Sequence, residues 1–101
     1  MVILGEEYEN FLLQLTKHFQ SVGYTEADML LKVSEENGEV AEAWIMSRGL
    51  KPSKGSAREV DVANELIDLV AAALIAVIQL GFQPNMLLAD HQKKMVERFL
   101  T

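Results

Sequence analysis

Four stretches of the chain repeat apolar residues at spacings of three and four, which is the period of one face of an α-helix. No stretch shows the strict alternation of a strand, and no longer repeat is present. The four helical stretches are about Glu6–Ser21, Thr25–Ser47, Ser56–Leu80 and Pro84–Phe99. Four helices joined by three connections predict an all-α protein with a single domain over residues 1–101, arranged as a four-helix up-and-down bundle.

Capping and turn residues mark where these helices start and end. Ser56 and Glu59 have the spacing of a capping box at the start of the third helix. Glycine is the usual residue just after a helix, so the first three helices are expected to end at Gly23, Gly49 and Gly81. The segment RGLKPSKGS, residues 48–56, is the one long connector.

The composition of the chain limits the size of its core and the kinds of partner that it can bind. A chain of 101 residues, half of them hydrophobic, can bury one modest core. The net charge of −6 and the pI near 4.8 argue against nucleic acid as a partner, because nucleic-acid modules usually carry a clustered basic surface. Cysteine is absent, which excludes a disulfide framework, a thiolate nucleophile and a cysteine-type zinc site.

Two features of the sequence bear on where in the cell the protein is expected. The N-terminal residues MVILGEEYE lack the basic region and the long apolar core of a signal peptide. The apolar run after Asp68 is twelve residues long, whereas a membrane span needs about 20. We therefore expect a cytoplasmic protein with no membrane partner.

The most informative stretch is Asn64–Leu80, because Asp68 is the only charged residue within its apolar part. Glu65 lies three residues before Asp68 and therefore on the same helix face. An ionised carboxylate in such an apolar helix is costly unless it is paired or binds a metal. The preceding helix carries a second pair with the same spacing, Glu36 and Glu39.

If the second and third helices pack antiparallel, these four carboxylates converge on one point inside the bundle. Ligand sets made only of oxygen suit hard cations, so we expect Mg²⁺, or Mn²⁺ in its place. One acidic pair at this spacing is more often a solvated helix face, but two pairs, one inside an apolar run, favour a metal site. Gly38 lies between the two glutamates of the second helix and is expected to leave room for a ligand or a neighbouring helix.

Basic and aromatic residues near the acidic pairs suggest an anionic substrate that carries a base. The candidate phosphate contacts are Lys32, Lys54, Arg58, Lys94 and Arg98. The candidate base contacts are Phe11, Gln14, His18 and Trp44. Both sets have a simpler interpretation, because loop lysines also keep a loop soluble and aromatic residues at helical spacing more often belong to the core.

The motif KVSEENGEVAEAW at residues 32–44, followed by ELID at residues 65–68, resembles a known signature. It is the ExxE and ExxD pattern of the all-alpha nucleoside triphosphate pyrophosphohydrolases, the MazG-like group that includes the dCTPase and dimeric dUTPase relatives. The segment KMVERF at residues 94–99 also looks like the basic segment that often closes this domain, although Gln92 stands where members often have Asn.

This resemblance implies cleavage of a nucleoside triphosphate to a monophosphate and pyrophosphate, as in nucleotide-pool house-cleaning. It also implies an all-alpha NTP pyrophosphatase-like fold and contacts from Lys94 and Arg98 to the triphosphate. The residues at the family's magnesium-ligand positions are Glu36, Glu39, Glu65 and Asp68.

Three functions were compared. The leading hypothesis is a magnesium-dependent hydrolase in which a spare carboxylate, Glu35 or Glu39, is the general base. The alternative is a non-catalytic helical interaction or regulatory module whose acidic face binds a basic protein surface, and Asp68 within an apolar run argues against it. A di-iron carboxylate bundle is excluded because neither histidine has a glutamate three positions before it.

The third helix also predicts an assembly. From Leu69 to Leu80 it is apolar around most of its circumference, and one small bundle has too little interior to cover such a helix. We expect another subunit to cover it, most simply in a two-fold homodimer. A homotetramer is the second option, because related pyrophosphohydrolases also form tetramers.

Overall fold

The computed structural model describes residues 3–101, so Met1 and Val2 of the expected domain lie outside it. Within this range the chain is all helical and has no strand, as predicted. The helices are α1 (Glu6–Ser21), α2 (Glu26–Ser47), the 3₁₀ turn η1 (Pro52–Lys54), α3 (Glu59–Gln79) and α4 (Pro84–Phe99). The boundaries expected from the sequence agree with these to within one residue, except at the start of α3.

Three glycines end α1, α2 and α3, as predicted. Gly23, Gly49 and Gly81 have φ angles of 95°, 67° and 96°, which is the left-handed region that side chains disfavour. At the end of α2 this geometry lets the N–H of Leu50 donate to the carbonyl of Ile45 at 3.1 Å. The turns are therefore compact because each has a glycine directly after the helix.

The start of α3 differs from the prediction. Asp61 Oδ2 accepts a hydrogen bond from the backbone N–H of Arg58 at 2.8 Å, so Arg58 is the N-cap. The expected capping box of Ser56 and Glu59 is wrong, because Asp61 and not Glu59 reaches back to the helix start. At α2, by contrast, Thr25 makes the predicted cap.

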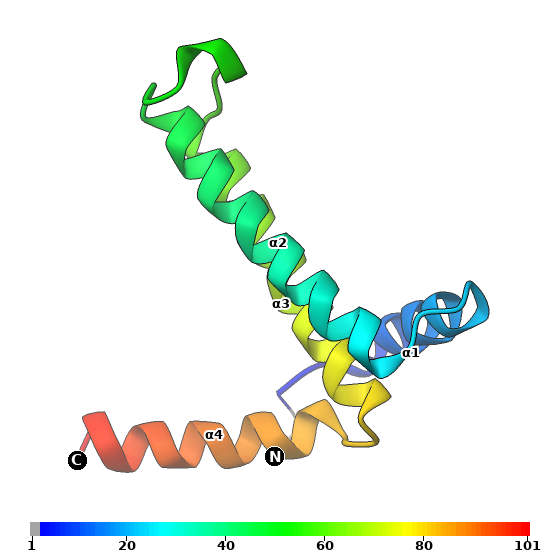
Figure 1. The fold of residues 1–101 in the computed structure, drawn as a ribbon. Helices are drawn as coiled ribbons and strands as arrows, with labels where there is room; N and C mark the ends of the chain where they lie inside the picture. Colours follow the sequence, from blue (N-terminus) through cyan, green and yellow to red (C-terminus); the bar gives the residue numbers. More distant parts are fainter. Residues whose placement is uncertain (1–2) are drawn as a thin grey trace.

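The helices α2 and α3 lie side by side and antiparallel, and together they form a long hairpin (Figure 1). The small side chains of Ala43 and Ala72 are buried, one on each helix of the hairpin. Helix α1 packs against α3 near one end of the hairpin. The core lies at this junction and consists of Leu12, Met29, Leu74, Ile75 and Ala76.

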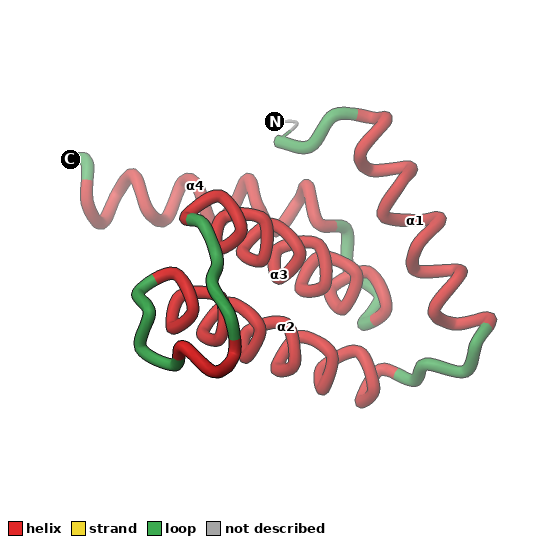
Figure 2. The backbone as a smooth tube through the Cα atoms, turned by 90° about the horizontal axis from the view of Figure 1, so that it is seen from above, coloured by secondary structure: helices red, strands yellow, loops and turns green. Residues whose placement is uncertain are grey.

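Helix α4 leaves the hairpin instead of packing along it. It makes a bend of 114° with α3 and, seen from above, lies on the side of α3 opposite α2 (Figure 2). Only its first part is anchored, since Pro84 is buried and Leu88 packs against the core. The radius of gyration is 16.1 Å, whereas a compact domain of this length has about 13 Å. One chain by itself therefore does not close the predicted four-helix bundle.

No single helix within residues 3–101 is long and apolar enough to cross a membrane. Only α3 and α4 taken together, as the sharply bent pair, reach the required length and composition.

Asn85 ties the N-terminal segment to the start of α4. Its Oδ1 accepts hydrogen bonds from the N–H groups of Ile3 and Leu4 at 3.1 and 2.6 Å. Its Nδ2 donates to the carbonyl of Leu4 at 3.2 Å and to Glu9 Oε2 at 2.6 Å. One side-chain amide thus connects α1, α4 and the segment before α1.

Replacing this amide tests its role in the fold. Asn85→Ala should lower the free energy of unfolding by about 1–3 kcal/mol, because several backbone groups lose their partner. Urea denaturation followed by circular dichroism measures the change. Asn10→Ala, at an exposed position of α1, is the control, and equal midpoints for the two variants would contradict the anchoring role.

Candidate metal centre

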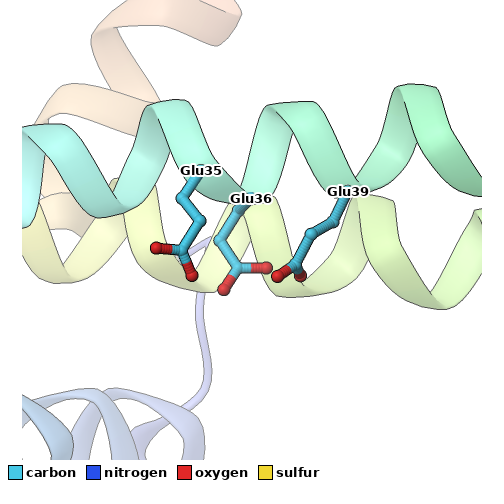
Figure 3. A group of neighbouring side chains, drawn as sticks. All are labelled: Glu35, Glu36 and Glu39. Carbon is cyan, nitrogen blue, oxygen red and sulfur yellow. The ribbon is translucent and has the colours of Figure 1, made fainter.

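Acidic side chains from α2 and α3 meet along the contact between the two helices. Asp68 and Glu39 are exposed there, contrary to the expected position inside the bundle, and only Glu36 and Glu65 are partly or mostly buried. Carboxylate oxygens of Glu36, Glu65 and Asp68 all lie within 4.8 Å of one another. Glu39 joins this group through Glu36, because oxygens of Glu35, Glu36 and Glu39 lie within the same distance of one another. Figure 3 shows these three glutamates projecting from α2 to the same side. The antiparallel packing thus brings the two predicted acidic pairs together, and we call these five residues the acidic cluster.

Part of the acidic cluster is buried without hydrogen-bond partners. The side chain of Glu36 is only 12% exposed, and its Oε1 lies 3.4 Å from Nζ of Lys32. Its Oε2 and the Oε2 of Glu65 are buried and have no hydrogen-bond partner among residues 3–101. A buried oxygen without a partner costs free energy, more so when it is charged. The protein by itself therefore leaves negative charge uncompensated at the α2–α3 contact.

Crowding among the carboxylates changes the acidity of Glu39. The neighbouring carboxyl of Glu36 is the main cause that raises the pKa of Glu39 above its ordinary value, because it favours the protonated form of Glu39 as a hydrogen-bonding group and its negative charge repels the ionised form. Desolvation and the charges of Glu65 and Glu35 act in the same direction. Two carboxyl groups that share a site cannot both ionise easily, so this shift is the sign of a site with excess negative charge.

The donor set fits a hard divalent cation. Glu36, Glu65 and Asp68 present carboxylate oxygens from two helices, and oxygen ligands are those that Mg²⁺ and Mn²⁺ prefer. The two buried oxygens without partners are the groups that such a cation would neutralise. No histidine belongs to the potential metal sites within residues 3–101, so the donors do not favour a softer metal.

Two pockets flank the acidic cluster. The first, which we call the aromatic pocket, has a volume of about 360 Å³ and includes Glu36 and Asp68 in its wall. Its other lining residues come from α1, α2 and α3 and are mostly apolar: Tyr8, Phe11, Leu15, Phe19, Lys32, Ile67, Ala71, Ala72 and Ile75. The cluster therefore borders a space large enough for a flat organic group.

The second pocket, which we call the loop pocket, lies toward the connector between α2 and α3 and has a volume of about 380 Å³. Glu39 and Glu65 are in its wall. The remaining lining residues are the large apolar Met46 and five residues that are polar, acidic or small: Glu42, Ala43, Ser56, Ala57 and Asp61. The acidic cluster thus lies between the mostly apolar aromatic pocket and the loop pocket, whose wall is mixed and partly acidic.

Of the residues predicted to contact the base of the substrate, only one lies at a pocket beside the acidic cluster. Phe11 lines the aromatic pocket, and so does Lys32, a predicted phosphate contact. Gln14 and His18 are exposed on α1 and are not among the lining residues. Trp44 is 45% exposed and lines neither pocket. The structure therefore favours Phe11 and leaves Gln14, His18 and Trp44 outside both pockets.

The four other predicted phosphate contacts, besides Lys32, are divided between two regions. Lys54 and Arg58 each lie 3.3 Å from a carboxylate that lines the loop pocket. Lys94 and Arg98 are on α4, which leads away from the hairpin (Figure 1). One chain therefore does not bring Lys94 and Arg98 to the acidic cluster, and their contacts to the triphosphate stay a prediction.

Other expectations need correction. A Cβ atom built on Gly38 would meet no atom within 4 Å, so this glycine does not make room for another helix of the same chain. The sequence also missed Tyr8 and Ile67 as pocket residues. Tyr8 shares a helix face with Phe11, but helical periodicity alone does not distinguish a pocket wall from a core.

No protein-family model matches this chain, and no curated protein or solved structure matches it either. The resemblance to the MazG-like pyrophosphohydrolases therefore rests on the motifs at residues 32–44, 65–68 and 94–99. The structure contributes a separate observation, which is that the two acidic motifs meet in space.

The raised pKa of Glu39 predicts a pH dependence of stability. The folded protein binds a proton at Glu39 more tightly than the unfolded chain does, so without metal its stability should rise as the pH falls from about 7 toward the ordinary glutamate pKa. Urea midpoints measured in EDTA across this range test the effect. Glu39→Gln should weaken the dependence, whereas Glu59→Gln, at an exposed position of α3, should retain it.

At still lower pH the trend should reverse. Backbone hydrogen bonds from Thr25 and Arg58 lower the pKa values of Asp28 and Asp61 below the ordinary value. The stability that these two carboxylates contribute is lost as the pH falls through their lowered pKa values. A wild-type midpoint that falls steadily from neutral pH, with no difference between the two glutamine variants, would contradict the role of Glu39.

Proposed function

We propose that this chain is a magnesium-dependent nucleoside triphosphate pyrophosphohydrolase that converts a (d)NTP to a (d)NMP and pyrophosphate. The observation that carries the proposal is the convergence of Glu36, Glu65 and Asp68 beside an aromatic pocket, with two buried carboxylate oxygens that lack partners. The resemblance of the ExxE and ExxD motifs supplies the reaction type. The proposal includes the NTP pyrophosphatase-like form of the all-α fold and nucleotide-pool cleaning as the role.

In this proposal the role of the acidic residues is to hold the cation and to fix its position. Glu36 comes from α2, whereas Glu65 and Asp68 come from α3, so these three residues would hold a cation in a place that helix packing sets, and not a loop. Glu39 adds a carboxylate on the side of the loop pocket. A bound Mg²⁺ would supply charge that neutralises the phosphates and would lower the pKa of an attacking water.

A general base must reach the water from the solvent side of the cluster. Glu35 and Glu39 are both exposed, and their oxygens lie within 4.8 Å of each other and of Glu36. Either carboxylate can therefore accept the proton, and we propose both as candidates for that role. Glu36 is less suited, because its side chain is mostly buried and already contacts Lys32.

The aromatic pocket is where we place the base of the nucleotide. The rings of Tyr8 and Phe11 have centroids 5.6 Å apart, and a base can stack on such rings whatever its identity. Lys32 lies between this wall and the cluster, with Nζ 5.6 Å from the ring centroid of Phe19 and 3.4 Å from Glu36 Oε1. A lysine in this position can contact a phosphate that extends from the pocket toward the carboxylates.

A pyrophosphate-release assay over canonical and modified (d)NTPs tests the reaction. We expect release that requires Mg²⁺ and stops in EDTA, with the monophosphate as the second product. Glu65→Gln should lower kcat/KM by about 100-fold or more, because it removes charge from the metal-binding group. Glu59→Gln, on the same helix but exposed, should retain the wild-type rate.

Other results of this assay would contradict the proposed reaction or favour the alternative function. Orthophosphate and a diphosphate as the only products would show that a different bond is cleaved. If no nucleotide is hydrolysed with Mg²⁺ or Mn²⁺ by a folded protein, the proposal fails. The non-catalytic interaction module is then the better account, because it needs only an acidic face that binds a basic protein surface and not a bound cation.

A further inference from the structure

Lys32 makes the most buried ion pair within residues 3–101. Its Nζ lies 3.4 Å from Oε1 of Glu36, and the two side chains are 24% and 12% exposed. Every side chain in the two other ion pairs of this range is at least 40% exposed. Exposed pairs contribute little to stability, whereas the loss of one partner from a buried pair leaves an uncompensated charge. The charge of Lys32 therefore matters more to this fold than that of a surface lysine.

Within the described residues, Lys32 is also the one cation that pairs with the acidic cluster. The two other ion pairs use Glu42 and Asp61, which lie outside the cluster. Five carboxylates thus have one ammonium group beside them. Glu36 still keeps its Oε2 buried and without a hydrogen-bond partner, although its Oε1 faces Lys32. One positive charge is present, but it does not balance the cluster.

Lys32 has a second acidic neighbour on its own helix. Asp28 lies four residues before Lys32 on α2, and Glu36 lies four residues after it. A helix favours the pair in which the acid precedes the base, which is the pair of Asp28 with Lys32. In the structure the ammonium group contacts Glu36 instead. Helix pairing alone does not explain this contact, whereas attraction by the other carboxylates of the cluster does.

Lys32 borders two pockets, so its ammonium group has room to move. One is the aromatic pocket, where Nζ lies 5.6 Å from the ring centroid of Phe19. The other has a volume of about 320 Å³, lies beside the turn between α1 and α2, and is called the turn pocket below. Asp28 and Glu35 belong to its wall. Because a lysine side chain is flexible, the ammonium group can leave Glu36 and still meet a carboxylate.

The contact between Lys32 and Glu36 is suited to exchange. The distance of 3.4 Å between Nζ and Oε1 is longer than the roughly 2.7–2.9 Å of a strong charge-assisted hydrogen bond. Glu36 also belongs, with Glu65 and Asp68, to the group that would hold a divalent cation. Two positive groups on one carboxylate repel each other. Lys32 and a cation at the cluster would therefore compete for Glu36.

We propose that Lys32 is the internal counter-cation of the acidic cluster. It neutralises Glu36 in the metal-free protein and moves toward the turn pocket when a divalent cation is bound. Lys32 is thus a positioning residue, which lowers the repulsion between α2 and α3 until a cation takes over that role. The inference rests on the cation site of the proposed function but not on the reaction. Within that function, release from Glu36 also frees the ammonium group to contact a phosphate.

Titration with Mn²⁺ alone, followed by electron paramagnetic resonance of the free ion, tests the competition. Lys32→Met removes the charge and keeps a long side chain, so its Kd for Mn²⁺ should be at least about fivefold lower than that of wild type. In EDTA the same variant should have a lower urea midpoint, because the cluster loses its counter-cation. Lys17→Met, at an exposed position of α1, should match wild type in both measurements, and Lys32→Arg should restore both values toward wild type.

The opposite signs of the two effects distinguish a counter-cation from a lysine that only stabilises the fold. A less stable Lys32→Met variant with unchanged or weaker Mn²⁺ binding overturns the proposal. The gain in affinity should disappear when Glu65→Gln is added, because the Mn²⁺ is then bound at the acidic cluster; a gain that persists overturns the proposal as well.

NMR of the lysine side chains gives a second measurement, on the wild-type chain, that does not depend on the folding of a variant. The Cε signal of Lys32 should shift when the protein is saturated with Mg²⁺, whereas that of Lys17 should not. A Lys32 signal that stays unmoved in the Mg²⁺-bound protein contradicts the exchange.

These results also separate this inference from the proposed function. Nucleotide hydrolysis by wild type, together with unchanged Mn²⁺ affinity in Lys32→Met, overturns the counter-cation role and leaves the function in place. The expected Mn²⁺ results from a protein that hydrolyses no nucleotide support the counter-cation role and refute the reaction. If folded wild type and Lys32→Met both bind no Mn²⁺, the cation site is refuted, and this inference with it.

Discussion

The repulsion between carboxylates that α2 and α3 hold together is the constraint on which the rest of the structure depends. Apolar packing at the junction with α1 forces the two helices side by side, and this places Glu36 against Glu65 and Asp68. Two of the resulting oxygens are buried without partners. A cation held at this place would change the interaction from repulsive to attractive, so the proposed metal binding would be coupled to the stability of the hairpin.

Parts of the fold outside the acidic cluster fix the positions of its carboxylates and of the neighbouring aromatic pocket. The acidic residues lie on long helices and not on loops, which limits how far they can move apart to relieve their repulsion. Helix α1 supplies the aromatic wall of the pocket, and its position is set by Leu12 in the core and by the hydrogen bonds of Asn85. The pocket, the core and the carboxylates are thus consequences of one three-helix packing.

Local signals in the sequence predicted the local structure well. Apolar periodicity located the four helices, and Gly23, Gly49 and Gly81 marked three of their ends. The start of α3 was missed because both Glu59 and Asp61 follow a possible cap by three residues, and the sequence does not show which of them turns back. The meeting of the two acidic pairs was predictable because antiparallel packing is the usual result of two consecutive helices.

The position of α4 was not predictable, because no local pattern encodes the angle at which a helix leaves its neighbour. The same limit applies to Lys94 and Arg98, whose distance from the acidic cluster depends on that angle. Tyr8 and Ile67 were missed for a related reason, since an apolar residue that lines a pocket has the same periodicity as one that fills a core. Such features depend on contacts between distant segments, or between copies of the chain.

Diffraction from crystals soaked in Mn²⁺, recorded where manganese scatters anomalously, tests the central claim most directly. The account predicts an anomalous peak between α2 and α3, bonded at about 2.1 Å to carboxylate oxygens of Glu36, Glu65 and Asp68. The same peak should be absent from crystals of Glu65→Gln. Peaks only at other places, or no peak at the acidic cluster at a concentration of Mn²⁺ that occupies surface carboxylates, would contradict it.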